Sequence, residues 1–234
     1  MSFSFLAGTS GTFNFFLLLI SFIYARRDCF QQADIDALGR SIRPDKHTYA
    51  PSPSGHFYIH YDTTGNASPD LEDLDDNGVP DYVDEVGIIA DSTYHVLVNV
   101  MGYTEEPFDG EGGYDIYITF YSSPYVYGYN YSIGGGVSYL KIDNDYGPQS
   151  AKSNFDLTPI QIMQLSVAHE YFHGIQWGYE LNLGNNAYFY EMTSMWFEDV
   201  MIPDGNDYLD GWTYPLLNNP TADFDNTGNG YELA

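Results

Sequence analysis

The chain has 234 residues, of which 44% are apolar and 18% aromatic, so intrinsic disorder is excluded as its main state. Only 7 Lys and Arg stand against 33 Asp and Glu, which gives a formal net charge of −26. Because a surface this acidic repels phosphate backbones and attracts divalent cations, nucleic acid is excluded as a partner. The single cysteine, Cys29, excludes an intrachain disulfide and a cysteine-rich zinc finger.

An apolar run near the N-terminus, Phe13–Ala25, is typical of the core of a signal peptide. It is shorter than the roughly 20 residues that a membrane-spanning helix needs, so no stable membrane span is expected beyond it. No Lys or Arg precedes the run, and Arg26 and Arg27 follow it, so an N-terminal anchor is the alternative. We expect residues 1–28 to be a signal peptide or anchor, residues 29–234 to form one catalytic domain, and the protein to be secreted.

The first half of the chain predicts mainly strands. After a lead-in loop that contains a short helix at Ala33–Gly39, the alternation in HFYIHY predicts a half-buried strand at His56–Tyr61. Apolar residues spaced by three and four predict an amphipathic helix over Tyr82–Met101, which Gly102 ends. Two further strands are predicted, separated by a loop rich in Tyr and Gly: Tyr114–Tyr121 and Val137–Ile142.

The second half predicts helices. Thr158, Pro159 and Gln161 form a capping box, which places the start of a long helix at Thr158 and its end near Gly178. A second helix is predicted over Tyr188–Met201, before the breaker Pro203-Asp204-Gly205. Strands followed by helices indicate an α+β fold, with the chemistry near the place where the two parts meet.

The long helix contains the pattern H-E-x-x-H, formed by His169, Glu170 and His173. Histidines at i and i+4 share one helix face, so both imidazoles can bind one metal ion, and Glu170 is placed to act on water rather than on the metal. With this composition, about 0.007 such patterns are expected by chance in a chain of this length. The pattern therefore favours a zinc site over two ordinary core histidines.

A catalytic zinc takes three protein ligands, so one more residue is needed. The extended pattern H-E-x-x-H-x-x-G-x-x-H is excluded, because Gln176 and Tyr179 stand where it requires Gly and His. The other large class takes a Glu from a following helix. Glu191 is our choice, and Glu180 is the competitor, on the turn just past the first helix.

Two acidic residues follow Glu191 by about two helical turns. Glu198 and Asp199 share its face, so either can accept a hydrogen bond from a ligating histidine, as carboxylates around metal sites do. The alternative interpretation is a solvated acidic face.

A second cation site is predicted in the acidic loop before the first long helix. The loop fits the calcium-binding template, with oxygen ligands at positions 1, 3, 5, 7, 9 and 12 and Gly78 at position 6 for the sharp turn. Position 12 is Asp rather than Glu, and no matching helix precedes the loop, so we expect a structural calcium site rather than a switch. The alternative is an acidic turn that caps the helix. The six expected ligands are Asp73, Asp75, Asn77, Val79 (through its carbonyl), Asp81 and Asp84.

These segments together resemble secreted bacterial zinc metalloproteases of the Glu-ligand (gluzincin) group. The resemblance lies in VAHEYFHGIQWGYE and YEMTSMWFEDVMIPDGNDY, and in the earlier blocks FYIHYDTTG, DDNGVPDYVDEV and GGYDIYITFY, in the same order. It implies a zincin-like fold, with an N-terminal twisted sheet and an active-site helix. It also implies zinc on His169, His173 and Glu191, with Glu170 as catalytic base. Gluzincins usually continue into a larger helical half that supplies an oxyanion donor, so we expect the helical C-terminal part to be incomplete here.

The expected activity is zinc-dependent hydrolysis of peptide bonds in a protein or peptide substrate, with Glu170 as general base. The substrate should lie extended along an edge strand, for which Val137–Ile142 is the candidate. Two alternatives stay open. One is a calcium-dependent extracellular binding or adhesion module with a non-catalytic zinc site, and the other is a zinc hydrolase of a non-peptide bond.

Overall fold

The computed structural model describes residues 30–32, 42–108, 110–123, 126–146, 157–179 and 187–205. Three expectations lie outside these residues: the signal or anchor segment 1–28, the short helix at Ala33–Gly39, and Glu180. Within the described part, no helix is both long and apolar enough to cross a membrane. The elements, in chain order, are β1 (Phe30–Gln32), β2 (Thr48–Pro51), β3 (Phe57–Tyr61), α1 (Asp81–Tyr94), η1 (His95–Val100), β4 (Tyr114–Thr119), β5 (Gly128–Gly134), β6 (Val137–Asp143), α2 (Pro159–Tyr179) and α3 (Ala187–Met201).

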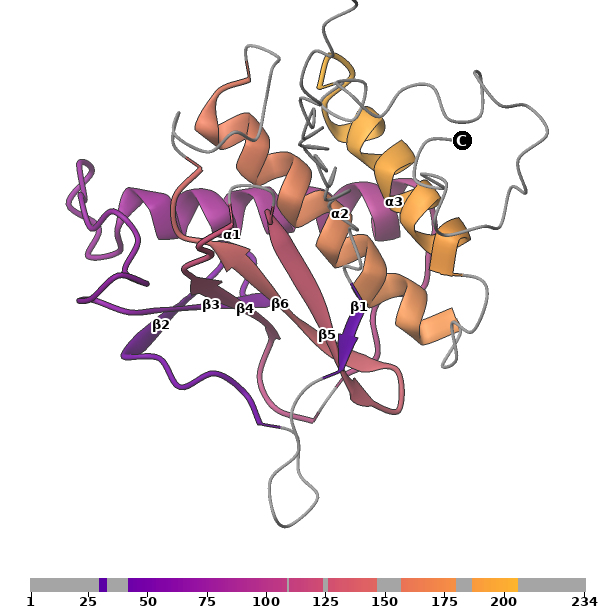
Figure 1. Cartoon of the computed structure of the whole chain (residues 1–234), viewed down its shortest axis with the longest axis horizontal. Helices are drawn as coiled ribbons and strands as arrows, with labels where there is room; N and C mark the ends of the chain where they lie inside the picture. The colour runs from indigo at the N-terminus through magenta and orange to yellow at the C-terminus, as the bar shows by residue number, and fades with distance from the viewer. Residues whose placement is uncertain are drawn as a thin grey trace, which may run out of the picture.

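The strands form one mixed sheet in the order β1-β5-β6-β4-β3-β2 (Figure 1). At its centre, β3 pairs with β4 and β4 with β6, all parallel, and α1 connects β3 to β4 as a crossover helix. β5 returns antiparallel beside β6, and β1 adds to the outer edge of β5 in parallel. The fold is therefore mixed α+β, as the sequence predicts.

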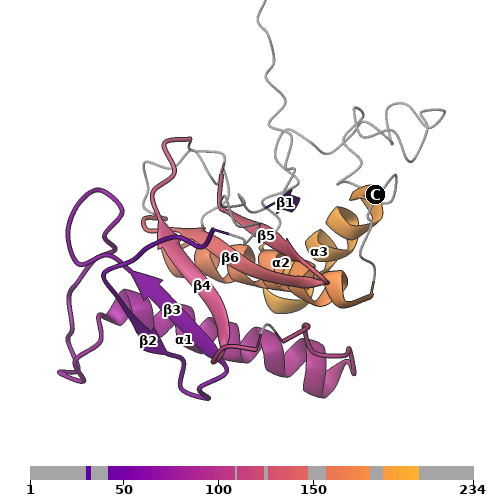
Figure 2. The same ribbon diagram turned by 90° about the horizontal axis from the view of Figure 1, so that it is seen from below.

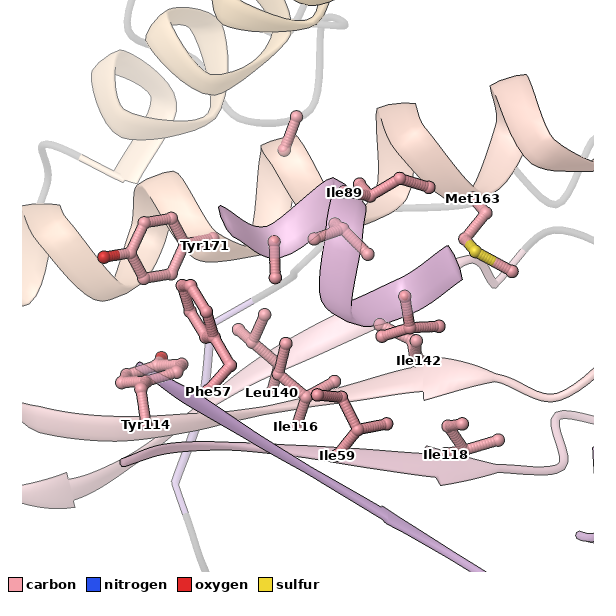
Figure 3. Packing of buried hydrophobic residues seen from close by; sticks show 14 of the residues in the cluster. Phe57, Ile59, Ile89, Tyr114, Ile116, Ile118, Leu140, Ile142, Met163 and Tyr171 are labelled. Carbon is pink, nitrogen blue, oxygen red and sulfur yellow. The ribbon is translucent and has the colours of Figure 1, made fainter. Parts of the chain in front are cut away.

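Helices α1 and α2 cover one face of the sheet, and α3 packs against α2 (Figures 1 and 2). Alternate residues of the central strands point into this layer and form the main core with residues of α1 and α2 (Figure 3). Ile59, Ile116, Ile118, Leu140 and Ile142 are all at most 1% exposed. Because α2 lies between the sheet and α3, it is buried along almost all of its length, from Ile162 to Trp177.

The other face of the sheet carries a row of aromatic side chains. Tyr117 and Tyr139 are buried there, with Tyr131 and Ile133 packed against them. His60 stacks on Tyr117 with a centroid distance of 4.5 Å, and its Nε2 lies 2.8 Å from an oxygen of Asp115, which also pairs with Arg43. Among the residues that the structure describes, this face is thus filled by tyrosines and a charged network.

Most predicted elements are confirmed, and three expectations are wrong. The segment interpreted as a Tyr- and Gly-rich loop contains β5, and the lead-in loop contains β2. The proposed edge strand, Val137–Ile142, is instead β6, which lies between β5 and β4 in the interior of the sheet. It cannot add a substrate strand, because neighbours occupy both of its edges. The predicted helix Tyr82–Met101 is α1 continued by η1, and Gly102 follows it with a φ of 81°.

Candidate metal centre

The helix that contains H-E-x-x-H begins with the predicted capping box. The amide of Thr158 donates to Oε1 of Gln161 at 2.9 Å, and the amide of Gln161 donates to Oγ1 of Thr158 at 3.3 Å. From this start, α2 runs for 21 residues and brings His169 and His173 to the side that faces α3. Their rings meet at a centroid distance of 4.6 Å, so one turn of α2 presents both imidazoles to the same point.

The third predicted ligand reaches that point from α3. Oε2 of Glu191 lies 3.1 Å from Nε2 of His169 and 3.6 Å from Nε2 of His173. These three residues form a group with one ligand atom each, all within 4.8 Å of one another, and all three are buried. Ligand atoms on a tetrahedral zinc at 2.0–2.2 Å are separated by about 3.4 Å, so the spacing fits such an ion.

The other nitrogen of each ring is held by a separate hydrogen-bond partner. Nδ1 of His169 donates to Oε1 of Glu198 at 2.5 Å. Nδ1 of His173 donates to Oε1 of Gln176 at 2.7 Å and lies 3.2 Å from Oγ of Ser194. With a proton on each Nδ1, the two Nε2 atoms face Glu191, and each can offer a lone pair to a metal ion once His169 has lost its second proton. Two imidazole lone pairs and a carboxylate at one buried point make an arrangement that a divalent cation stabilises.

Burial and charge act in opposite directions on these groups. Burial alone lowers the pKa of His169, but its hydrogen bonds to Glu191 and Glu198 raise it to about 10. Burial likewise raises the pKa of Glu191, and the two histidines reverse this and lower it to about 2. For His173, burial dominates and the pKa is lowered. The carboxylate of Glu191 is therefore ionised at neutral pH, and a metal ion that binds here replaces a proton on His169.

The predicted catalytic base, Glu170, lies between α2 and β5 and is 2% exposed. Strand β5 approaches so closely that a Cβ on Gly128 would lie 3.0 Å from Cγ of Glu170 and 2.9 Å from the carbonyl oxygen of Lys141. Further along β5, Nδ2 of Asn130 donates to the carbonyl of Glu170 at 3.0 Å, and its Oδ1 accepts from Nε1 of Trp177 at 2.9 Å. Asn130 thus fixes the position of the motif helix relative to β5.

The acidic loop brings only some of its predicted calcium ligands together. Oxygens of Asp73, Asp75 and Asp81 lie within 4.8 Å of one another, and Gly78 has the predicted left-handed backbone, with a φ of 89°. Asn77 instead donates through Nδ2 to Asp84 at 2.7 Å, and its Oδ1 accepts from the amide of Val79 at 2.8 Å. The arrangement agrees with three of the six predicted ligands, and calcium binding stays a prediction.

The structure brings His169, His173 and Glu191 together as predicted, with Glu170 beside them. Of the two acidic candidates on α3, Glu198 makes the hydrogen bond to His169, and the role of Asp199 stays a prediction. Sequence reasoning missed Gln176, Ser194 and Asn130. A signal existed for two of them, since Gln176 lies three residues after His173 and Ser194 three after Glu191, each on its ligand's helix face.

Comparisons with protein-family models, with curated proteins and with solved structures found no match. The resemblance to gluzincin metalloproteases and the zincin-like details of the fold therefore stay predictions from the sequence motifs.

Proposed function

We propose that this protein is a zinc-dependent endopeptidase. The observation that carries the proposal is the convergence of Nε2 of His169, Nε2 of His173 and Oε2 of Glu191 at one buried point. A donor set of two imidazoles and one carboxylate is the set that catalytic zinc uses in one large class of peptidases, and it leaves a coordination position for water. Glu198 and Gln176 would hold the two rings in the orientation that metal binding requires.

When bound, zinc would supply a Lewis acid that polarises the scissile carbonyl and acidifies water. The chain's own residues carry the proton. The carboxylate of Glu170, one residue from a ligand, accepts the proton of the attacking water and later donates it to the leaving amine. Burial of Glu170 keeps bulk water from competing for this proton.

The substrate in this proposal is an extended polypeptide that adds as a strand to β5. This strand replaces β6 as the candidate, because only the three-residue strand β1 lies outside it and because β5 contacts Glu170 through Gly128 and Asn130. Strand addition supplies backbone hydrogen bonds that do not depend on the substrate's sequence. The peptide bond to be cleaved would then lie beside the residues that act on it. In the same proposal, a calcium ion in the Asp73, Asp75 and Asp81 loop would be structural, and the enzyme would act outside the cell.

The test combines zinc analysis with hydrolysis of unfolded casein by wild type, Glu170→Gln and Glu111→Gln. Glu170→Gln keeps the side-chain volume and the three ligands, so it should retain stoichiometric zinc and lose about 10²–10⁴-fold in kcat/KM. Glu111 is an exposed glutamate in the loop before β4, and its variant should match wild type. A protein that does not bind zinc would contradict the proposal.

Two other outcomes would point to the alternative functions. Stoichiometric zinc without turnover by wild type would favour an extracellular binding or adhesion module. Cleavage of small esters or amides but not of casein would favour a zinc hydrolase of another bond.

A further inference from the structure

The outer edge of β5 is covered by a short strand from the start of the described chain. β1 pairs in parallel with β5, with Phe30 opposite Asn130, Gln31 opposite Tyr131 and Gln32 opposite Ser132. It forms the end of the sheet beyond β5 (Figure 1). The edge to which a substrate strand would add is therefore already occupied over three residues.

One of the three covered residues, Asn130, belongs to the proposed site. The side chain of Asn130 binds the carbonyl of Glu170, and Gly128, two residues before it, lies so close that an added Cβ would be 3.0 Å from Cγ of Glu170. Neighbouring strands in a sheet lie about 4.8 Å apart, so a peptide that follows β5 past Gly128 would need the space in which β1 lies. The two strands cannot pair with this edge at the same time.

We propose that β1 is an internal competitor for the substrate edge, and that the enzyme is latent while β1 is paired and active when β1 is released. This inference rests on the proposed function. A strand tethered in the same chain competes at an effective concentration in the millimolar range, so it outcompetes a dilute peptide. Since β1 pairs over only three residues, its release requires few hydrogen bonds to break. Cleavage of the chain near β1, or a partner that binds it, would open the edge.

The experiment weakens β1 in the full chain. The double variant Gln31→Pro/Gln32→Pro removes two successive backbone N–H groups, one of which faces β5, because N–H groups alternate in direction along a strand. The matched control is Gln31→Ala/Gln32→Ala, which keeps both donors. Two quantities are measured: binding of a fluorescent unfolded-casein peptide to each variant in the Glu170→Gln background, and casein hydrolysis in the active background.

The proline pair is expected to bind the peptide about tenfold more tightly than the alanine pair and to show about a tenfold higher kcat/KM, since loss of the competitor raises the fraction of open edge. Tighter binding without hydrolysis would support the competition and overturn the peptidase. Hydrolysis with equal binding and equal kcat/KM in the two pairs would overturn the competition and leave the peptidase standing. The second result would mean that β1 only protects the sheet edge from aggregation.

A second measurement uses the native β1 sequence and so does not depend on how the proline variant folds. Saturating peptide is added to the Glu170→Gln protein, and hydrogen exchange is followed at the amides of Gln31 and Gln32. Faster exchange at these amides on peptide binding supports displacement of β1. Peptide binding with unchanged exchange there, or no peptide binding at all, overturns it.

Discussion

The hydrogen bond between His169 and Glu198 gives the sharpest test of the proposed metal centre. We expect Glu198→Gln to weaken zinc binding while the protein stays folded. Glutamine keeps the length of the side chain and an oxygen that can accept from Nδ1 of His169, so the variant removes mainly the negative charge. Both side chains are only 4% exposed and the bond is 2.5 Å long, so solvent does little to replace what is lost.

The size of the effect follows from the role of such partners. A carboxylate that accepts from a ligating histidine fixes the ring and increases the basicity of the nitrogen that binds the metal, and its loss typically costs 10–100-fold in metal affinity. This corresponds to about 1.4–2.7 kcal/mol. The same carboxylate also raises the pKa of His169 and so favours the competing proton. The loss should therefore be larger at pH 9 than at pH 6, where proton competition offsets part of it.

The assay is zinc competition against a chromogenic chelator. Asp199→Asn is the matched control, because it removes a carboxylate from the next residue of α3, which does not make the hydrogen bond to His169. It should bind zinc as wild type does. Wild-type zinc affinity in Glu198→Gln would refute the role of Glu198, and an equal loss of affinity in both variants would show that only net charge matters.

Three further predictions concern other parts of the fold. Burial, followed by the charge of Arg43, lowers the pKa of His60 from 6.5 to about 4, so the unfolded chain binds more protons between these values. The neutral state of His60 therefore contributes fully to the free energy of unfolding above pH 6.5, and this contribution is lost as the pH falls to 4. After discounting for solvent screening, the free energy of unfolding of wild type, measured with urea, should fall over this range by about 1.5 kcal/mol more than that of His60→Gln. Gly128→Ala should destabilise the protein by about 1–3 kcal/mol, because its Cβ meets backbone and side-chain atoms at 2.9–3.1 Å; an unchanged urea midpoint would mean that β5 can move away. Calcium at about 100 times its Kd should stabilise wild type by about 2.7 kcal/mol and raise its Tm, but not that of Asp75→Asn/Asp81→Asn, and equal shifts in both would assign the effect to another site.

The convergence of His169, His173 and Glu191 could be predicted because helix geometry links sequence spacing to spatial position. His169 and His173 share a face of any regular helix, and the capping box at Thr158 fixes where that helix begins. Glu198 could be named only as one of two candidates. The side chains of adjacent residues on a helix point in directions about 100° apart, and the packing of α3 on α2 decides which of them faces the histidine. That packing is a tertiary fact that local spacing does not contain.

Strand β5 was not predicted, because its polar residues lie on the buried face and its aromatic residues on the opposite face. The residues that face α2, Gly128, Asn130 and Ser132, are small or polar, and the tyrosines between them point to the other face. Hydrophobic alternation assigns the apolar residues to the buried face, but here the buried face contacts a polar network around Glu170. The misplacement of the edge had a different cause: β5 folds back outside β6, and pairing between distant strands does not appear in a local pattern.

The two kinds of ligand in the proposed centre come from different helices, two from α2 and one from α3. A cation bound between them would cross-link the two helices and close the loop of 18 residues from His173 to Glu191, much as a covalent cross-link does. The attachment of the last described helix would then depend on the supply of free zinc. Under chelation, α3 should be the first element to detach, and other proteases would gain access to it before the sheet unfolds.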